Sequence, residues 1–215
     1  MQRRLQPVVE ETEKFHVEVE TLWANLPQPA SRRSMVVHGY CLLVRQHVFG
    51  QVVLARAGLD VPATTLVRPA FESLVRAIWC SRAANESWIA RFVTPNPDAV
   101  QSDGETEMGP NVQRMLDQIE AKEPSHIHQS LLELKRETWR AMHSFVHGGI
   151  RPVIQSLARF PEHEVAGVIM NANLMLVVAT NLVRMNSGVP SPQLPALQMR
   201  YAGCLPPSSR RPESD

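Results

Sequence analysis

Apolar residues recur at helical spacing along most of this chain. Residues 31–58, for example, carry Val37, Leu42, Leu43, Val48 and Val52 along one expected helix. No segment shows the strict alternation of apolar and polar residues that is typical of a half-buried strand. The pattern predicts an all-α fold: a single-domain helical bundle of four to five long helices plus short helices.

Turn and capping residues interrupt the pattern and place the expected helix ends. We expect helices over residues 7–23, 31–58, from 60 through 78, 86–93, 111–122, from 124–125 to 147, a short one ending at 160, and 161–186. Ser31 and Asn85 are candidate N-caps. Pro69 either kinks the third helix or lies near its true start. Residues 95–110 carry turn residues without an apolar period, which indicates a surface loop.

The C-terminal segment has a different composition. Six of the 17 prolines lie in the 28 residues from Gly188 onward. We therefore expect a helical bundle domain over residues 1–187 and a Pro-rich, loosely ordered tail over residues 188–215.

Composition narrows the class of protein. The 215 residues are 44% hydrophobic and 20% charged, as in an ordinary globular domain, and the net charge is +1. Without a strong overall charge, an anion site must be local, and we find no evidence for DNA binding. No apolar run approaches the roughly 20 residues needed to span a bilayer, and no secretory signal is recognisable. We expect a cytoplasmic protein without a membrane partner.

The three cysteines do not predict a disulfide framework or a zinc site. Cys41, Cys80 and Cys204 are odd in number and widely spaced. We expect Cys41 and Cys80 to be small core residues, and Cys204 to be an incidental residue of the tail.

One polar stripe in the second half of the chain is the strongest candidate for chemistry. In a helix, Arg136, Arg140, His143 and His147 fall within an arc of about 60°. Arg140 and His147 lie roughly 10 Å apart along the axis. A guanidinium matches phosphate oxygens, and an imidazole can move a proton near neutral pH, with the helix C-terminus favouring its charged form.

Two glycines follow this stripe, and they allow two interpretations. Gly148 and Gly149 carry no side chain, so a ligand could approach the backbone closely. Alternatively, the stripe is a plain polar face, His147 caps the helix and the Gly-Gly pair stops it. The sequence leaves both open.

A second candidate is a charged ladder in the third helix. Arg68, Glu72 and Arg76 follow one another at steps of four residues. The ladder is either a solvated set of ion pairs or part of a site in which Glu72 holds a guanidinium for a ligand. Val75 and Trp79 share its side of the helix, which indicates that another element, such as the helix with the polar stripe, partly covers it.

Metal and cofactor chemistry find little support. His143 and His147 could share an ion, but no carboxylate or further histidine stands at the spacing of a metallohydrolase motif. Glycine-rich nucleotide motifs and a nucleophile elbow are absent from the sequence. We predict neither a metal nor a cofactor. Asn173 and Thr180 share a face of the last long helix and are either satisfied core residues or site lining.

The stripe also resembles a known family. Arg140 and His147, with six residues between them, match the Arg-x(4–6)-His signature of HEPN domains, which are α-helical bundles. Residues 66–73 and 144–149 resemble bacterial helical proteins, some of them linked to abortive infection. The resemblance implies a metal-independent endoribonuclease whose site is completed in a homodimer. In this chain Ala141 follows the arginine, where HEPN domains often carry Asn or His.

Three hypotheses follow. The first is a HEPN-like protein that cleaves or binds RNA or a nucleotide, as a candidate defence toxin, with Arg140 and His147 as catalytic residues. Its substrate-binding residues would be Arg68, Glu72, Arg76, Arg136, His143, Gly148 and Gly149. The alternative is a non-catalytic helical module that binds a nucleotide or a partner protein in the same groove. The third is a purely structural bundle.

Overall fold

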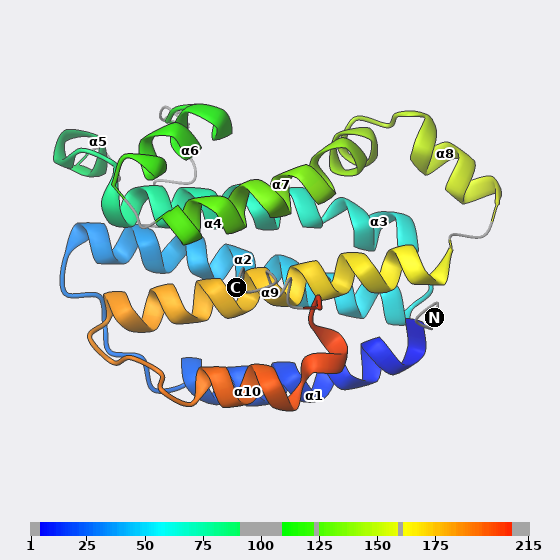
Figure 1. The fold of residues 1–215 in the computed structure, drawn as a ribbon, viewed down its shortest axis with the longest axis horizontal. Helices are drawn as coiled ribbons and strands as arrows, with labels where there is room; N and C mark the ends of the chain where they lie inside the picture. Colours follow the sequence, from blue (N-terminus) through cyan, green and yellow to red (C-terminus); the bar gives the residue numbers. More distant parts are fainter. Residues whose placement is uncertain (1–4, 91–108, 123–124, 159–160, 208–215) are drawn as a thin grey trace, which may run out of the picture.

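The computed structural model describes residues 5–90, 109–122, 125–158 and 161–207, without the side chains of residues 125, 126 and 137–143. The α-helices in these ranges are α1 (Leu5–Trp23), α2 (Arg32–Arg56), α3 (Asp60–Thr65), α4 (Val67–Arg82), α5 (Glu86–Ala90), α6 (Val112–Glu120), α7 (Ser125–Val146), α8 (Ile150–Leu157), α9 (Glu162–Asn186) and α10 (Leu194–Arg200) (Figure 1). A 3₁₀ turn, Ala202–Cys204, follows α10, and the described ranges contain no strand. The fold is all-α, as the sequence predicts.

Local capping chemistry accounts for several helix ends. The side chain of Ser31 accepts a hydrogen bond from the backbone N–H of Ser34 and caps α2. Asn85 accepts in the same way from the N–H of Trp88 at the start of α5. Pro69 is the third residue of α4, where its missing N–H costs no helical hydrogen bond, so it marks the true start of that helix and not a kink. Most of the expected loop over residues 95–110 lies outside the described residues.

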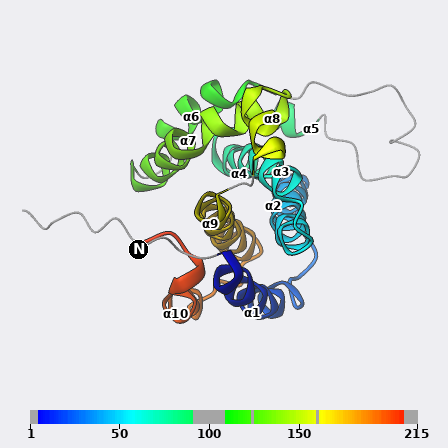
Figure 2. The ribbon, with the colours of Figure 1, turned by 90° about the vertical axis from the view of Figure 1, so that its right-hand side faces the viewer.

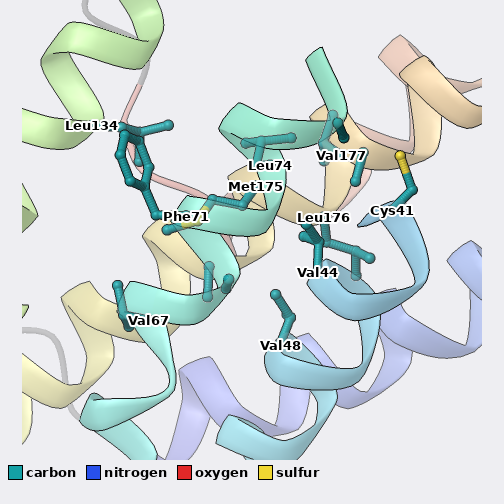
Figure 3. Close-up of a cluster of buried hydrophobic side chains, with 14 of the residues drawn as sticks. Cys41, Val44, Val48, Val67, Phe71, Leu74, Leu134, Met175, Leu176 and Val177 are labelled. Atoms are coloured by element: carbon teal, nitrogen blue, oxygen red, sulfur yellow. The ribbon is translucent and has the colours of Figure 1, made fainter. Parts of the chain in front are cut away.

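Three long helices, α2, α4 and α9, form the centre of the bundle. Figure 3 shows their apolar side chains meeting, with Val44 and Val48 from α2, Phe71 and Leu74 from α4, and Leu176 from α9. All five are fully buried. Burial of this kind stabilises a fold by roughly 1.5–3 kcal/mol for each large apolar side chain. The expectation that Cys41 and Cys80 are core residues is confirmed, because both are 0% exposed.

The composition of α9 follows from its central position. Among the described residues, α9 is the one helix whose length and mean hydropathy of 1.7 would suffice to cross a membrane. The sequence expectation that no apolar segment reaches this length therefore needs correction. In the structure α9 packs against α1, α2 and α4, and 61% of the apolar segment is buried (Figure 2). A helix surrounded on several sides is apolar around most of its circumference.

The expected loose tail is wrong for residues 194–205. There α10 and the 3₁₀ turn pack against α1 and α9, and Leu194, Leu197, Cys204 and Leu205 are buried. The backbone N–H of Gly203 also donates to the Glu11 carboxylate at 3.0 Å. Prolines here shape the path of the chain without preventing its packing. Residues 208–215 lie outside the described part.

A buried polar network joins α1, α9 and the C-terminal turn. The Asn173 amide donates to Thr12 Oγ1 and to the carbonyl of Cys204, both at 2.9 Å. Its oxygen lies 2.9 Å from His16 Nε2, so that nitrogen carries the proton and donates. Elsewhere on α9, Thr180 Oγ1 accepts from the Trp23 indole at 3.0 Å. Asn173 and Thr180 are therefore satisfied core residues and not site lining.

Candidate functional site

The end of α7 is built by the two glycines. Gly148 has φ = +62°, a left-handed conformation that residues with a Cβ rarely adopt. The N–H of Gly149 then donates to the carbonyl of Ser144 at 2.8 Å, which is the bond of a Schellman motif. A Cβ at position 149 would lie 2.5 Å from Ser144 Oγ. Both glycines thus have a structural reason, as in the helix-stop interpretation, and their role towards a ligand stays a prediction.

This turn holds His147 against α4. The Nη1 atom of Arg68 lies 3.1 Å from Nε2 of His147, although the two residues are 79 positions apart in the sequence. His147 is exposed, whereas the side chain of Arg68 is only 19% exposed. The first residue of the charged ladder and the last residue of the polar stripe therefore meet at the surface.

Glu72 fixes the orientation of this guanidinium. Its Oε1 atom accepts from Nε of Arg68 at 2.8 Å, one helical turn along α4, and the Glu72 side chain is 27% exposed. Because a guanidinium only donates, Nε2 of His147 must accept in the contact with Arg68. This contact requires an imidazole whose hydrogen is on Nδ1.

The third member of the ladder faces a different neighbour. Arg76 forms a hydrogen bond with Tyr40 of α2. Burial raises the pKa of Tyr40, and the charge and hydrogen bond of Arg76 partly oppose that rise. The ladder thus divides: Arg68 and Glu72 lie beside the end of α7, and Arg76 is engaged with α2.

Other helices partly cover the side of α4 that carries the ladder, as Val75 and Trp79 led us to expect. Both are buried, and the Trp79 indole donates to Gln118 Oε1 of α6 at 2.6 Å. Trp79 also meets the ring of Trp88 edge-on, with 4.6 Å between the centroids. α6 and α7 both pack on α4, so the ladder is not a fully solvated face.

The remaining members of the stripe fall in two groups. Arg140 and His143 are part of α7, but their side chains lie outside the described residues. Arg136 is exposed and lines a groove of about 880 Å³ that is bounded by α7, α9 and the segment from α10 to residue 207. It lies about 16 Å along the α7 axis from His147. Arg136 therefore belongs to a second surface.

Sequence reasoning missed this groove. Its α7 wall contains Ser130 and Glu133 besides Arg136, and its far wall belongs to the segment that was expected to be loose. A signal was present in the spacing of Ser130, Glu133 and Arg136, which recur every three residues along one helix face. The other wall of the groove is formed by α10 and the residues that follow it. This wall was not expected, because the prolines of this segment predicted a loosely ordered tail. Within the described residues, no three His, Cys, Asp or Glu side chains gather closely enough to hold a metal ion.

A comparison with protein families adds one finding. The pattern of DUF6988, a family of unknown function, matches residues 41–207, well over half of the chain. The chain belongs to the DUF6988 family. The matched range includes α4, α7, α9 and α10, and therefore both Arg68 and His147 and the groove of Arg136. No curated protein and no solved structure shows a significant match.

Proposed function

We propose that this DUF6988 protein binds a phosphodiester of RNA where Arg68 and His147 meet, and cleaves it without a metal. The single observation that carries the proposal is the 3.1 Å contact between the guanidinium and the exposed imidazole. Arg140 of the neighbouring α7 is the further arginine of the site by its sequence position, as the HEPN resemblance implies.

The chemistry assigns one role to each group. Arg68, oriented by Glu72, donates to a non-bridging phosphate oxygen and stabilises the charge that develops there. On binding, the phosphate takes the place of His147 as the acceptor of the Arg68 Nη1 proton. The lone pair of His147 Nε2 then becomes available to accept the proton of the ribose 2′-hydroxyl.

The resulting reaction balances without a cofactor. The 2′ oxygen forms a bond to phosphorus, the bond between phosphorus and the 5′ oxygen breaks, and the leaving oxygen takes a proton from water. The products are a 2′,3′-cyclic phosphate and a 5′-hydroxyl end. A DNA strand of the same sequence lacks the attacking hydroxyl and stays intact.

A cleavage assay tests the proposal. Purified full-length protein is incubated with a labelled single-stranded RNA in excess chelator, and with the matching DNA as the substrate control. We expect RNA cleavage that falls by about 10²- to 10⁴-fold in His147→Gln, the range that a general base contributes. Arg68→Gln and Arg140→Ala should also be strongly impaired.

Matched variants separate the site from general effects of charge and stability. His163→Gln and Arg114→Gln remove the same side-chain types from exposed positions on α9 and α6, and both should cleave like the wild type. Circular dichroism melts establish that each variant is folded. Wild-type protein that leaves RNA intact at high enzyme concentration would overturn the cleavage proposal.

The non-catalytic alternative rests on Ala141, the position where HEPN domains often carry a polar residue. It predicts thermal stabilisation by a nucleotide without turnover. The same Arg68→Gln and His147→Gln variants should then lose the stabilisation. A melt in the presence and absence of nucleoside phosphates distinguishes the two functions.

A further inference from the structure

Helix α8 presents an apolar stripe to solvent. Ile150, Val153, Ile154 and Leu157 stand at the i, i+3, i+4, i+7 spacing of one helix face, and they are 73%, 53%, 53% and 85% exposed. Pro152, on another side, is the buried residue of this helix. The stripe exposes on the order of 400 Å² of apolar surface, a patch size that often marks a contact site.

The groove that Arg136 lines is covered by no helix among the described residues. α7 packs on α3, α4, α6 and α8, and α10 packs on α9, so the groove lies between α7, α9 and the segment from α10 to residue 207. Its apolar lining includes Leu134, Leu174, Met199 and Leu205, and Met199 is 74% exposed.

We propose that α8 of one copy docks in this groove of a second copy, and that the two copies exchange α8 reciprocally. The lengths agree: α8 spans about 12 Å, and the α7 wall from Ser130 to Arg136 spans about 9 Å. One ion pair is available as well: Arg151, the one charged residue of α8, flanks its stripe, and the groove wall carries Glu133 beside Arg136. This inference does not depend on the proposed function.

The area favours reciprocal docking over direct pairing of two α8 helices. Two stripes in contact would bury only about 800 Å², the size of a crystal contact, whereas reciprocal docking buries roughly 1,350 Å², within the range of specific interfaces. A closed twofold exchange also covers every stripe and every groove, so assembly stops at the dimer.

Cysteine cross-linking between copies tests the arrangement. A tagged Ile154→Cys variant is mixed with an untagged Met199→Cys variant of a different size, and a short bismaleimide is added. The native cysteines give little background because all three are buried. We expect more of the mixed product, which joins position 154 of one copy to position 199 of the other, than of either product that joins two copies of the same variant. A predominant Ile154-to-Ile154 product would overturn the proposal, because it indicates direct pairing of α8 helices.

Light scattering after size-exclusion chromatography provides the second readout. The wild type should be a dimer at about 100 µM, where a standard interface is occupied. Leu157→Glu and Met199→Glu should each weaken the dimer at least tenfold. Val53→Glu, at a valine of α2 that is 68% exposed, is the matched control and should remain dimeric.

A charge exchange tests the ion pair. Arg151→Glu should weaken the dimer, and the double variant Arg151→Glu/Glu133→Arg should restore it. A monomeric wild type, or a dimer insensitive to Leu157→Glu, would overturn the proposal.

Discussion

The buried His16 makes the stability of this protein depend on pH. Its ring stacks on Phe49 with 4.3 Å between centroids and donates to Asn173 at 2.9 Å. Burial lowers the pKa of His16 from 6.5 to about 4, while the hydrogen bond to Asn173 opposes that change. In the unfolded chain the imidazole regains its ordinary pKa. Between these values the unfolded state binds more protons, so stability falls as the pH falls.

The magnitude follows from the two pKa values. Above pH 7 both states hold His16 neutral and the stabilising contribution is complete. Lowering the pH from 7 to 5 should remove about 2 kcal/mol of unfolding free energy through this residue, and the loss levels off near 3 kcal/mol once the pH falls below about 4.

Urea denaturation followed by far-UV circular dichroism at pH 7 and pH 5 measures this loss. His16→Gln keeps an amide that can donate to Asn173, and it cannot titrate. The wild type should lose about 2 kcal/mol more than His16→Gln over this interval, and His163→Gln, at an exposed position, should behave like the wild type. Burial also lowers the pKa of His38 and His47, but these residues are present in every variant and cancel in the comparison. Equal losses in the wild type and His16→Gln would refute the reasoning.

Three further predictions concern stability and reactivity. Gly148→Ala should cost about 1–2 kcal/mol in a denaturant melt because of its positive φ, and an unchanged melt would contradict the turn described for α7. Ser31→Ala should cost about 1 kcal/mol through loss of the α2 cap, whereas a change within error would argue against that cap. Burial raises the pKa of Cys80 to about 12 and of Cys204 to about 11, so an aromatic disulfide reagent at pH 8 should label the native thiols far more slowly than the thiols in urea. Rapid native labelling of either thiol would contradict their burial.

Much of the helical framework could be predicted because its signals are local. Ser31 and Asn85, the expected N-caps, act through side chains that reach only three residues ahead. Pro69 allowed either a kink or a helix start, and the sequence alone did not decide between them. The packing of α10 was not predictable from proline content, since it depends on the burial of Leu194 and Leu197 where α10 packs on α9.

The candidate site was predictable only as two separate helix faces. Periodicity places Arg68 and Glu72 together, and it places Arg136 and His147 on one stripe. Which faces meet depends on the tertiary packing of α7 across α4, and no local signal encodes a contact between residues 79 positions apart. That packing brings His147 to Arg68 and leaves Arg136 at the groove.

A double-mutant cycle on RNA cleavage tests most directly whether Arg68 and His147 act as one unit. Single-turnover rates are measured in chelator for the wild type, Arg68→Gln, His147→Gln and the double variant. Groups that act together are strongly non-additive, so the double variant should be no slower than about the slower single variant. Effects that multiply, or single variants that cleave at the wild-type rate, would contradict a shared site.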